Sequence, residues 1–169
     1  MIPRMTKQAR WLTEDEQHLW RLLLAASTKV SKTIDDRLQS VSEISSPEFA
    51  VLVTLSETDE HALRLRELCN ALGWDRSRAS HQITRMAKRG LVTKGKSPGD
   101  ARGVLVSLTD DGMARLEDAV PDHVETVRRL VFDHITPQRA KVLSEAFTDI
   151  VEAEEVPDDV PDGGPKEQD

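Results

Sequence analysis

The sequence predicts a mainly helical protein with one small antiparallel β-hairpin, so that an α+β lobe is flanked by long helices. Two observations support this fold class. Apolar residues recur at helical spacing over most of the chain, and typical capping residues precede the segments. Residues 91–108 differ, because two short runs rich in β-branched residues flank a polar segment that contains Gly and Pro.

The overall composition permits one ordinary domain, or a small domain with an oligomerisation element. The 169 residues are 38% hydrophobic and 31% charged, with a net charge of −7. No run of 18 apolar residues occurs, so we expect no membrane span. The N-terminal MIPRMTKQAR lacks the apolar segment of a secretory signal. Cys69 is the only cysteine and cannot form an intrachain disulfide, which fits a cytoplasmic protein.

Two capping patterns predict where the first two helices begin. Thr13 and Glu16 form a capping box, so a helix is expected to begin near residue 14. Apolar residues then recur every three or four positions as far as Leu38, over roughly 25 residues of helix. A helix of this length in a short chain suggests packing against a second subunit. Ser45 and Glu48, with Pro47 between them, predict the second helix.

The next two helices are short and are joined by a tight turn. The first contains leucines at helical spacing and ends at Gly73. Asp75 is expected to cap the second, which ends at Gly90. Three positions of this second helix are expected to be buried: Ala79, Ile83 and Met86.

The predicted hairpin and two further helices complete the chain. Residues 91–93 and 104–108 are the strands, with KGKSPGDARG as the hairpin tip. Thr109 or Asp110 caps a fifth helix, which either kinks at Pro121 or gives way there to a new segment. Thr136-Pro137 begins the sixth helix. From Glu152 onward, eight acidic residues and one lysine predict a disordered tail.

These elements predict a division of the chain into tails, a helical dimerisation region and a central lobe. The boundaries are as follows: flexible N-terminal tail 1–12, dimerisation region 13–42 and 110–152, helix-turn-helix lobe with its hairpin 43–109, and acidic tail 153–169.

The segment from Asp75 to Arg102 is strongly basic within an acidic chain. It contains eight Lys and Arg residues and two Asp residues. Phosphate binding, rather than folding, favours such a concentration of positive charge, so the segment predicts contact with nucleic acid. Helix, turn, helix and hairpin in this order form a winged helix-turn-helix, whose second helix fits the major groove of DNA.

The outer and leading positions of the second helix of this motif are polar or basic. Because Arg pairs with guanine and Gln with adenine, these side chains are candidates for reading base edges. The predicted base readers are Arg76, Ser77, Arg78 and His81, with Ser80 and Gln82 as further candidates, Gln82 facing partly inward. Arg85 and Lys88 lie later in the helix and are expected to contact phosphate. The alternative interpretation is a solvated basic face.

The hairpin adds further basic side chains. Lys94 and Lys96 lie on its ascending strand, and Arg102 lies near its tip, where it can enter the minor groove. Asp100 is two residues before Arg102 and can hold the guanidinium in one rotamer. The alternative is a turn-forming Asp with an incidental Arg.

The chain resembles the MarR family of bacterial winged-helix transcriptional regulators over about residues 14–152. The most specific part is the D-x-R of the wing with a downstream L-T-x-x-G. The matching segments are Leu65–Cys69, Arg85–Val92, Asp100–Arg102, Val106–Thr109 and Gly112. The segments around Trp11–Glu14, Trp20 and Gly73–Met86 further resemble an actinobacterial branch.

The resemblance implies a homodimer built from the first, fifth and sixth helices. It further implies a repressor that binds an inverted-repeat operator in double-stranded DNA and is associated with the nucleoid. A small aromatic effector that releases the DNA is a hypothesis at this level, with His18 and Trp20 as candidate ligand contacts; plain packing of Trp20 is the alternative.

Other functions are less well supported by the residues. Cys69 is a candidate redox switch, as in family members that sense oxidants; the alternative, which its position between Leu68 and Leu72 favours, is a small core residue. A winged helix that binds protein rather than DNA is a further alternative, and it would bind without a steep salt dependence. We identify no metal-ligand spacing, no cofactor motif and no catalytic constellation, so we expect neither a metal nor a cofactor, and no enzyme.

Overall fold

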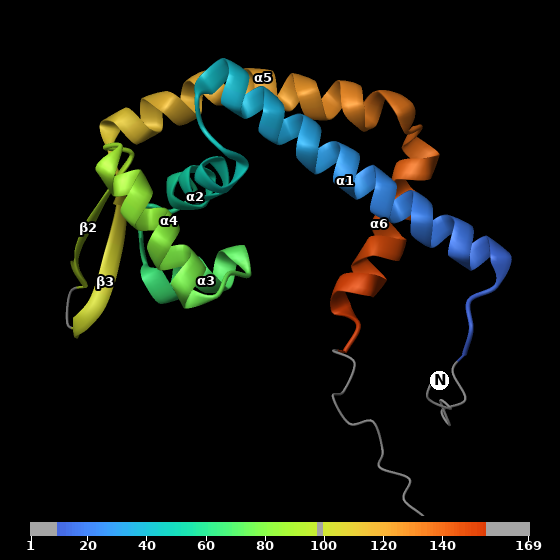
Figure 1. Ribbon diagram of the computed structural model, residues 1–169, viewed down its shortest axis with the longest axis horizontal. Coiled ribbons are helices and arrows are strands. Elements are labelled where there is room, and N and C mark those ends of the chain that lie inside the picture. Colours follow the sequence, from blue (N-terminus) through green and yellow to red (C-terminus); the bar gives the residue numbers. More distant parts are fainter. Residues whose placement is uncertain (1–9, 98–99, 155–169) are drawn as a thin grey trace, which may run out of the picture. The chain divides into compact units, whose positions relative to one another are not determined.

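The computed structural model describes residues 10–97 and 100–154. The chain forms two compact units, Met1–Val131 and Phe132–Asp169. The first unit contains five helices and a small sheet among its described residues, and the second contains a short 3-10 helix and one α-helix. The prediction of a mainly helical fold with a small β-element is confirmed (Figure 1).

The first two helices, α1 (Glu14–Ser42) and α2 (Ser46–Ser56), begin at the predicted capping boxes. The Thr13 backbone N–H donates to the Glu16 carboxylate at 2.7 Å, and this bond lowers the pKa of Glu16. The Ser45 N–H donates to the Glu48 carboxylate at 2.8 Å in the same way. Each box satisfies backbone donors that a helix start leaves unpaired, so the local sequence determines both starts.

The helix-turn-helix consists of α3 (Leu65–Leu72) and α4 (Arg76–Lys88). Gly73 ends α3 with a φ of 62°, a left-handed conformation that glycine adopts without a Cβ penalty. The Asp75 side chain accepts the Arg78 backbone N–H at 2.9 Å and caps α4. The predicted turn and cap are therefore both confirmed.

The sheet contains one strand more than the sequence analysis predicts. The hairpin strands β2 (Val92–Ser97) and β3 (Asp100–Leu108) pair antiparallel, and β1 (Ala62–Arg64) pairs with the other edge of β3. Three residues are too few for an alternating pattern to be visible, which explains why β1 was missed. The hairpin strands also extend further toward the tip than expected.

Helix α5 (Asp110–Leu130) is continuous and packs along α1 (Figure 1). Thr109 caps it by accepting the Gly112 N–H at 2.9 Å. The helix runs through Pro121 without interruption, so no new segment begins there. An ion pair between Arg37 and Asp122 joins α1 to α5.

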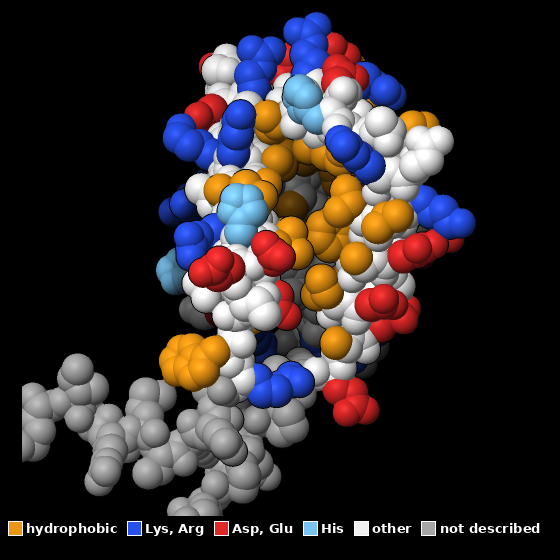
Figure 2. All heavy atoms as spheres, turned by 90° about the vertical axis from the view of Figure 1, so that its right-hand side faces the viewer, with side chains coloured by type: hydrophobic (Ala, Val, Ile, Leu, Met, Phe, Trp, Pro, Cys, Tyr) orange, Lys and Arg blue, Asp and Glu red, His pale blue; other side chains and the backbone are white. Residues whose placement is uncertain are grey.

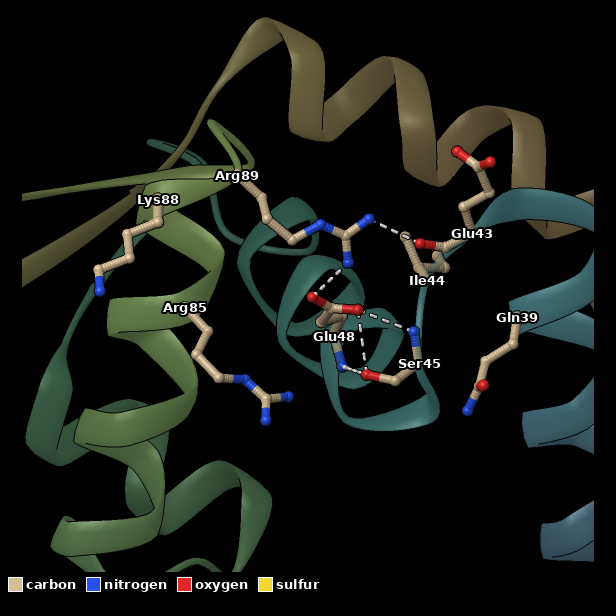
Figure 3. Close-up of a pocket in the computed structure, with 8 residues that line it drawn as sticks. All are labelled: Gln39, Glu43, Ile44, Ser45, Glu48, Arg85, Lys88 and Arg89. Atoms are coloured by element: carbon tan, nitrogen blue, oxygen red, sulfur yellow. Dashed lines mark hydrogen bonds and ion pairs between the residues drawn. The ribbon is translucent and has the colours of Figure 1, made fainter.

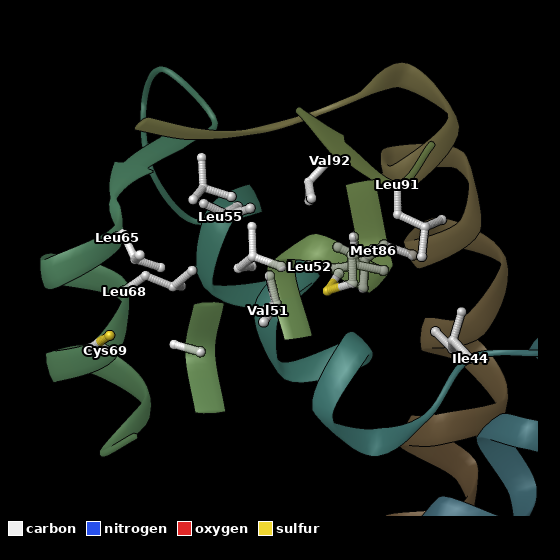
Figure 4. Packing of buried hydrophobic residues seen from close by; sticks show 14 of the residues in the cluster. Ile44, Val51, Leu52, Leu55, Leu65, Leu68, Cys69, Met86, Leu91 and Val92 are labelled. Carbon is white, nitrogen blue, oxygen red and sulfur yellow. The ribbon is translucent and has the colours of Figure 1, made fainter. Parts of the chain in front are cut away.

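The hydrophobic core lies mainly inside the lobe formed by α2, α3, α4 and the sheet (Figure 4), and Leu38 of α1 and Leu116 and Ala119 of α5 also belong to it. Leu52 and Leu55 from α2 and Ile83 and Met86 from α4 are almost completely buried, and Val106 closes the core from β3. The three α4 positions predicted to face inward are buried as expected. This core fixes the orientation of the opposite, outward face of α4.

The second unit contains η1 (Phe132–His134) and α6 (Pro137–Glu152). Thr136 caps α6 by accepting the Arg139 N–H at 3.4 Å, so the predicted start is confirmed. No described side chain of this unit is buried. Large apolar side chains on α6 are instead exposed, including Val142 at 64% and Ile150 at 63%.

The first half of α1 also exposes apolar side chains. Leu19 is 67% exposed, Leu22 53% and Trp20 52%. Figure 2 shows hydrophobic side chains exposed among charged ones on this side of the molecule. Within residues 10–97 and 100–154, no helix is long and apolar enough to span a membrane.

Candidate nucleic-acid interface

The outward face of α4 presents most of the residues predicted to contact DNA. Its apolar face is held in the core by Ala79, Ile83 and Met86. The residues exposed on its other side are Arg76, Ser77, Arg78, Ser80, His81, Arg85 and Lys88. A helix with this distribution offers guanidinium, hydroxyl and imidazole donors along one side, as major-groove reading requires.

Gln82 corrects the predicted set of base readers. Only 8% of its surface is exposed, so its amide faces the core side of α4 rather than the groove side. Its Oε1 accepts a hydrogen bond from the Arg85 guanidinium at 3.0 Å, whereas its buried Nε2 has no partner among the described residues. Gln82 thus orients Arg85 and is not available to an adenine edge in this conformation.

Trp74 and Arg78 form a contact that the sequence analysis did not identify. The Arg78 guanidinium lies over the Trp74 ring, with its carbon 4.6 Å from the ring centroid. Trp74 is half-buried and packs against the core of the lobe. A tryptophan in the turn, four residues before an arginine of the second helix, was the available signal.

The hairpin places two more basic side chains at the solvent-facing surface. Lys94 and Lys96 are exposed on β2, and Lys94 donates to the Thr84 hydroxyl of α4 at 3.2 Å. The backbone of Asp100 and Arg102 belongs to β3, but their side chains lie outside the described part of the structure. Their roles in the wing remain predictions.

An ion pair joins the end of α4 to the start of α2 (Figure 3). The Glu48 carboxylate is 4% exposed and accepts from the Arg89 guanidinium at 2.7 Å, while Arg89 also donates to the Glu43 carbonyl at 2.6 Å. A cavity of about 600 Å³ lies beside this pair, and Arg85 and Lys88 also line it. The sequence indicates Glu48 only as a capping residue, and no local pattern reveals its pairing with Arg89.

Cys69 lies in a different cavity. It is 9% exposed and lines a space of about 730 Å³ together with Trp74 and several arginines, among them Arg66 and Arg76. This position agrees with a small core residue at the edge of a polar cavity. Redox sensing through Cys69 stays a prediction.

The residues predicted to contact a small effector lie in neither of these cavities. His18 and Trp20 are exposed on α1 and line neither cavity. Within the described part of the chain, no three His, Cys, Asp or Glu side chains could together hold a metal ion.

His123 on α5 is a partly buried histidine outside the basic face. Burial lowers its pKa, and its ring contacts Phe49 with ring centroids 4.4 Å apart.

Comparisons with known proteins agree with this geometry. Residues 44–104 match the MarR family. The transcriptional regulator PecS of Dickeya dadantii is 30% identical over 114 residues, which cover 65% of this chain and 69% of PecS.

Two solved structures from Streptomyces coelicolor are also similar. The MarR family transcriptional regulator Sco3205, solved in complex with DNA, superposes with a TM-score of 0.83 at 36% identity, covering 86% of this chain and 91% of that one. AbsC, a MarR family transcriptional regulator, superposes with a TM-score of 0.81 at 33% identity over 85% of this chain and 97% of its own. Together with the helix-turn-helix, the hairpin and the exposed basic helix, these similarities establish that the chain belongs to the MarR family of transcriptional regulators.

Proposed function

We propose that this protein is a homodimeric, sequence-specific repressor that binds an inverted-repeat operator in double-stranded DNA. The main observation is the outward face of α4, where seven polar or basic side chains are exposed on a helix anchored by its apolar side. Arg76, Arg78 and His81 read base edges, while Arg85 and Lys88 bind phosphate. Lys94, Lys96 and Arg102 extend the contact along the hairpin.

The dimer part of the proposal rests on the exposed apolar side chains of α1 and α6. Side chains such as Leu19 and Val142 are each more than 60% exposed in the isolated chain. Exposed apolar side chains on each of these two helices are typical of surfaces that pack against another protein chain. A twofold dimer has two copies of α4, which can occupy successive major grooves of a palindromic site.

The proposed role is binding rather than catalysis, in a protein of the cytoplasm and its nucleoid. The Sco3205 structure, which contains DNA, provides the supporting precedent at 36% identity. A small aromatic effector, contacted by His18 and Trp20, is a further hypothesis of this proposal.

The test is selection of duplexes from a randomised library by the purified protein, followed by mobility-shift titration. We expect enrichment of an inverted repeat, and a loss of affinity of about tenfold or more for Arg78→Ala or Arg102→Ala, since one bidentate base contact provides about 1–3 kcal/mol of discrimination. Arg10→Ala, an exposed arginine before the start of α1 and outside the lobe and the predicted dimerisation region, is the matched control and should bind normally.

Salt distinguishes this function from a protein-binding winged helix. Affinity for the selected duplex should fall steeply and log-linearly as salt rises, because bound phosphates release counterions. Failure to enrich any sequence, or unchanged affinity in both arginine variants, would refute the proposal.

A further inference from the structure

The arginines of the lobe are held in different ways. The Arg85 guanidinium donates to Gln82, and that of Arg89 donates to Glu48 and to the Glu43 carbonyl. The Arg78 guanidinium has no hydrogen-bond acceptor within the described part of the chain, and its contact is the face of the Trp74 ring at 4.6 Å. Arg78 therefore keeps its N–H donors available while its position is restricted.

A stacked guanidinium can still read a base. Cation–π contact uses the flat face of the guanidinium, whereas a bidentate hydrogen bond uses the N–H groups on its edge. Guanine presents O6 and N7 in the major groove as a matching pair of acceptors. Stacking on Trp74 and pairing with guanine are consequently compatible in geometry.

Both ends of the arrangement are anchored in the lobe. Trp74 packs against the core, and the Trp74 backbone N–H donates to the Cys69 carbonyl at 3.0 Å. The Arg78 backbone N–H is held by the Asp75 side chain at 2.9 Å. A long arginine side chain loses less conformational freedom on binding when a rigid ring already restricts it.

We propose that Trp74 is a positioning residue that orients Arg78 for reading one guanine in each half-site of the operator. This inference rests on the proposed function, because it requires that α4 read DNA. Trp74 itself does not contact a base. It acts by fixing the side chain that does, so that removal of the ring reduces discrimination at one base pair without altering phosphate contacts.

The experiment combines four variants with two duplexes. The first duplex is selected by the wild-type protein from a random library. Selection with Arg78→Ala identifies the guanine that is no longer preferred, and in the second duplex this guanine is replaced by adenine in both half-sites. The variants are Trp74→Leu, Arg78→Ala and their combination, with Trp74→Phe as a form that keeps an aromatic face. Binding is measured by fluorescence anisotropy, and folding by circular dichroism.

An exposed cation–π contact corresponds to about two- to fivefold in affinity for one half-site. We expect Trp74→Leu to lose about four- to twenty-five-fold on the selected duplex, since a dimer contains two such contacts, and to lose little on the substituted one. In the Arg78→Ala background, Trp74→Leu should have no further effect on either duplex. Trp74→Phe should keep most of the wild-type preference.

The opposite pattern would overturn the inference. If Trp74→Leu weakened both duplexes equally, or still weakened binding without Arg78, the ring would only support the fold. If Trp74→Leu does not fold, Trp74→Phe and Arg78→Lys test the proposal instead. Lysine lacks the planar guanidinium that stacks on the ring and pairs with guanine, so an Arg78→Lys variant with the wild-type base preference would contradict the proposal. Absence of binding by the wild-type protein would refute the proposed function together with this inference, whereas normal binding with unchanged base preference refutes this inference alone.

Discussion

The lobe buries its large apolar side chains, whereas the first half of α1 and helix α6 expose theirs. In the lobe, α2, α3, α4 and the sheet enclose side chains such as Leu52 and Met86, which have no exposed surface. On the first half of α1, Leu19 and Leu22 are more than half exposed, and α6 buries none of its side chains. The same residue types thus form a closed core in one region and an open surface in the other.

This contrast indicates which part of the protein is complete within one chain. The lobe buries its apolar side chains within one chain, with the end of α1 and part of α5 packed against it, and can hold α4 rigidly, as a base-reading helix requires. The flanking helices leave apolar area in water, at a cost of roughly 25 cal/mol per Å² relative to burial. We infer that a second copy covers them, and that dimerisation sets the distance between the two reading helices.

The largest expected effect comes from removing a side chain of the closed core. Leu52→Ala should lower the free energy of unfolding by about 2–5 kcal/mol, because it deletes buried methyl groups and leaves a cavity. Chemical denaturation monitored by circular dichroism measures this loss. The loss should be the same at low and high protein concentration, since Leu52 lies within one chain.

Leu19→Ala is the matched control from the open surface. Its effect on stability should vanish at protein concentrations low enough to dissociate the dimer. A concentration-independent loss as large as that of Leu52→Ala would contradict the contrast between the two regions.

The second prediction concerns the open surface directly. Leu19 and Leu23 lie four residues apart on one face of α1, and replacing both by Glu places charges in the proposed interface. We expect a monomer by analytical ultracentrifugation and an operator affinity reduced about 100-fold or more, because two linked half-site contacts become independent. Circular dichroism should show unchanged helicity. A variant that remains dimeric would exclude this face of α1 from the interface.

The third prediction tests the close packing where the lobe meets α5. A Cβ added at Gly112 would lie 2.1 Å from the Leu91 carbonyl oxygen, which is backbone and cannot move aside alone. Gly112→Ala should therefore destabilise by about 1–3 kcal/mol, although Ala favours helices over Gly. Gly95→Ala has open space around it and should lose much less. A stabilised Gly112→Ala would show that the approach of α5 to the Leu91 backbone is loose.

Much of the fold was predictable because its signals are local. Capping boxes at Thr13 and Ser45, the left-handed turn at Gly73 and the Asp75 cap each depend on residues within a few positions of one another. Helical periodicity likewise identified the buried face of α4. The strand β1 was not predicted, because it is defined only by its pairing with β3, more than 40 residues away in sequence.

The site was less predictable, because several of its contacts join residues that are distant in sequence. Exposure of Arg76, Arg78 and Arg85 follows from helix periodicity, but burial of Gln82 depends on packing against the rest of the lobe. The Glu48–Arg89 pair joins residues 41 positions apart, and no local pattern encodes it. The Trp74–Arg78 contact was within reach of the sequence, although the ring lies outside the helix and its direction does not follow from helix periodicity.

The smallest expected effect is a pH dependence at the junction of α2 and α5. Burial lowers the pKa of His123 below its ordinary value, the opposing charge of Asp122 is the weaker influence, and the ring contacts Phe49. The unfolded chain therefore binds a proton more readily than the folded one, so stability is highest above the unfolded pKa of about 6.5 and falls as pH decreases through it toward the folded value.

Thermal unfolding between about pH 7.5 and 5.5 should show this loss of stability, and His123→Phe should reduce it, because an aromatic ring is kept while the titrating nitrogen is removed. An identical profile for wild type and His123→Phe would mean that this junction opens enough to hydrate the imidazole, and that the packing of α2 against α5 is less closed than that of the lobe core.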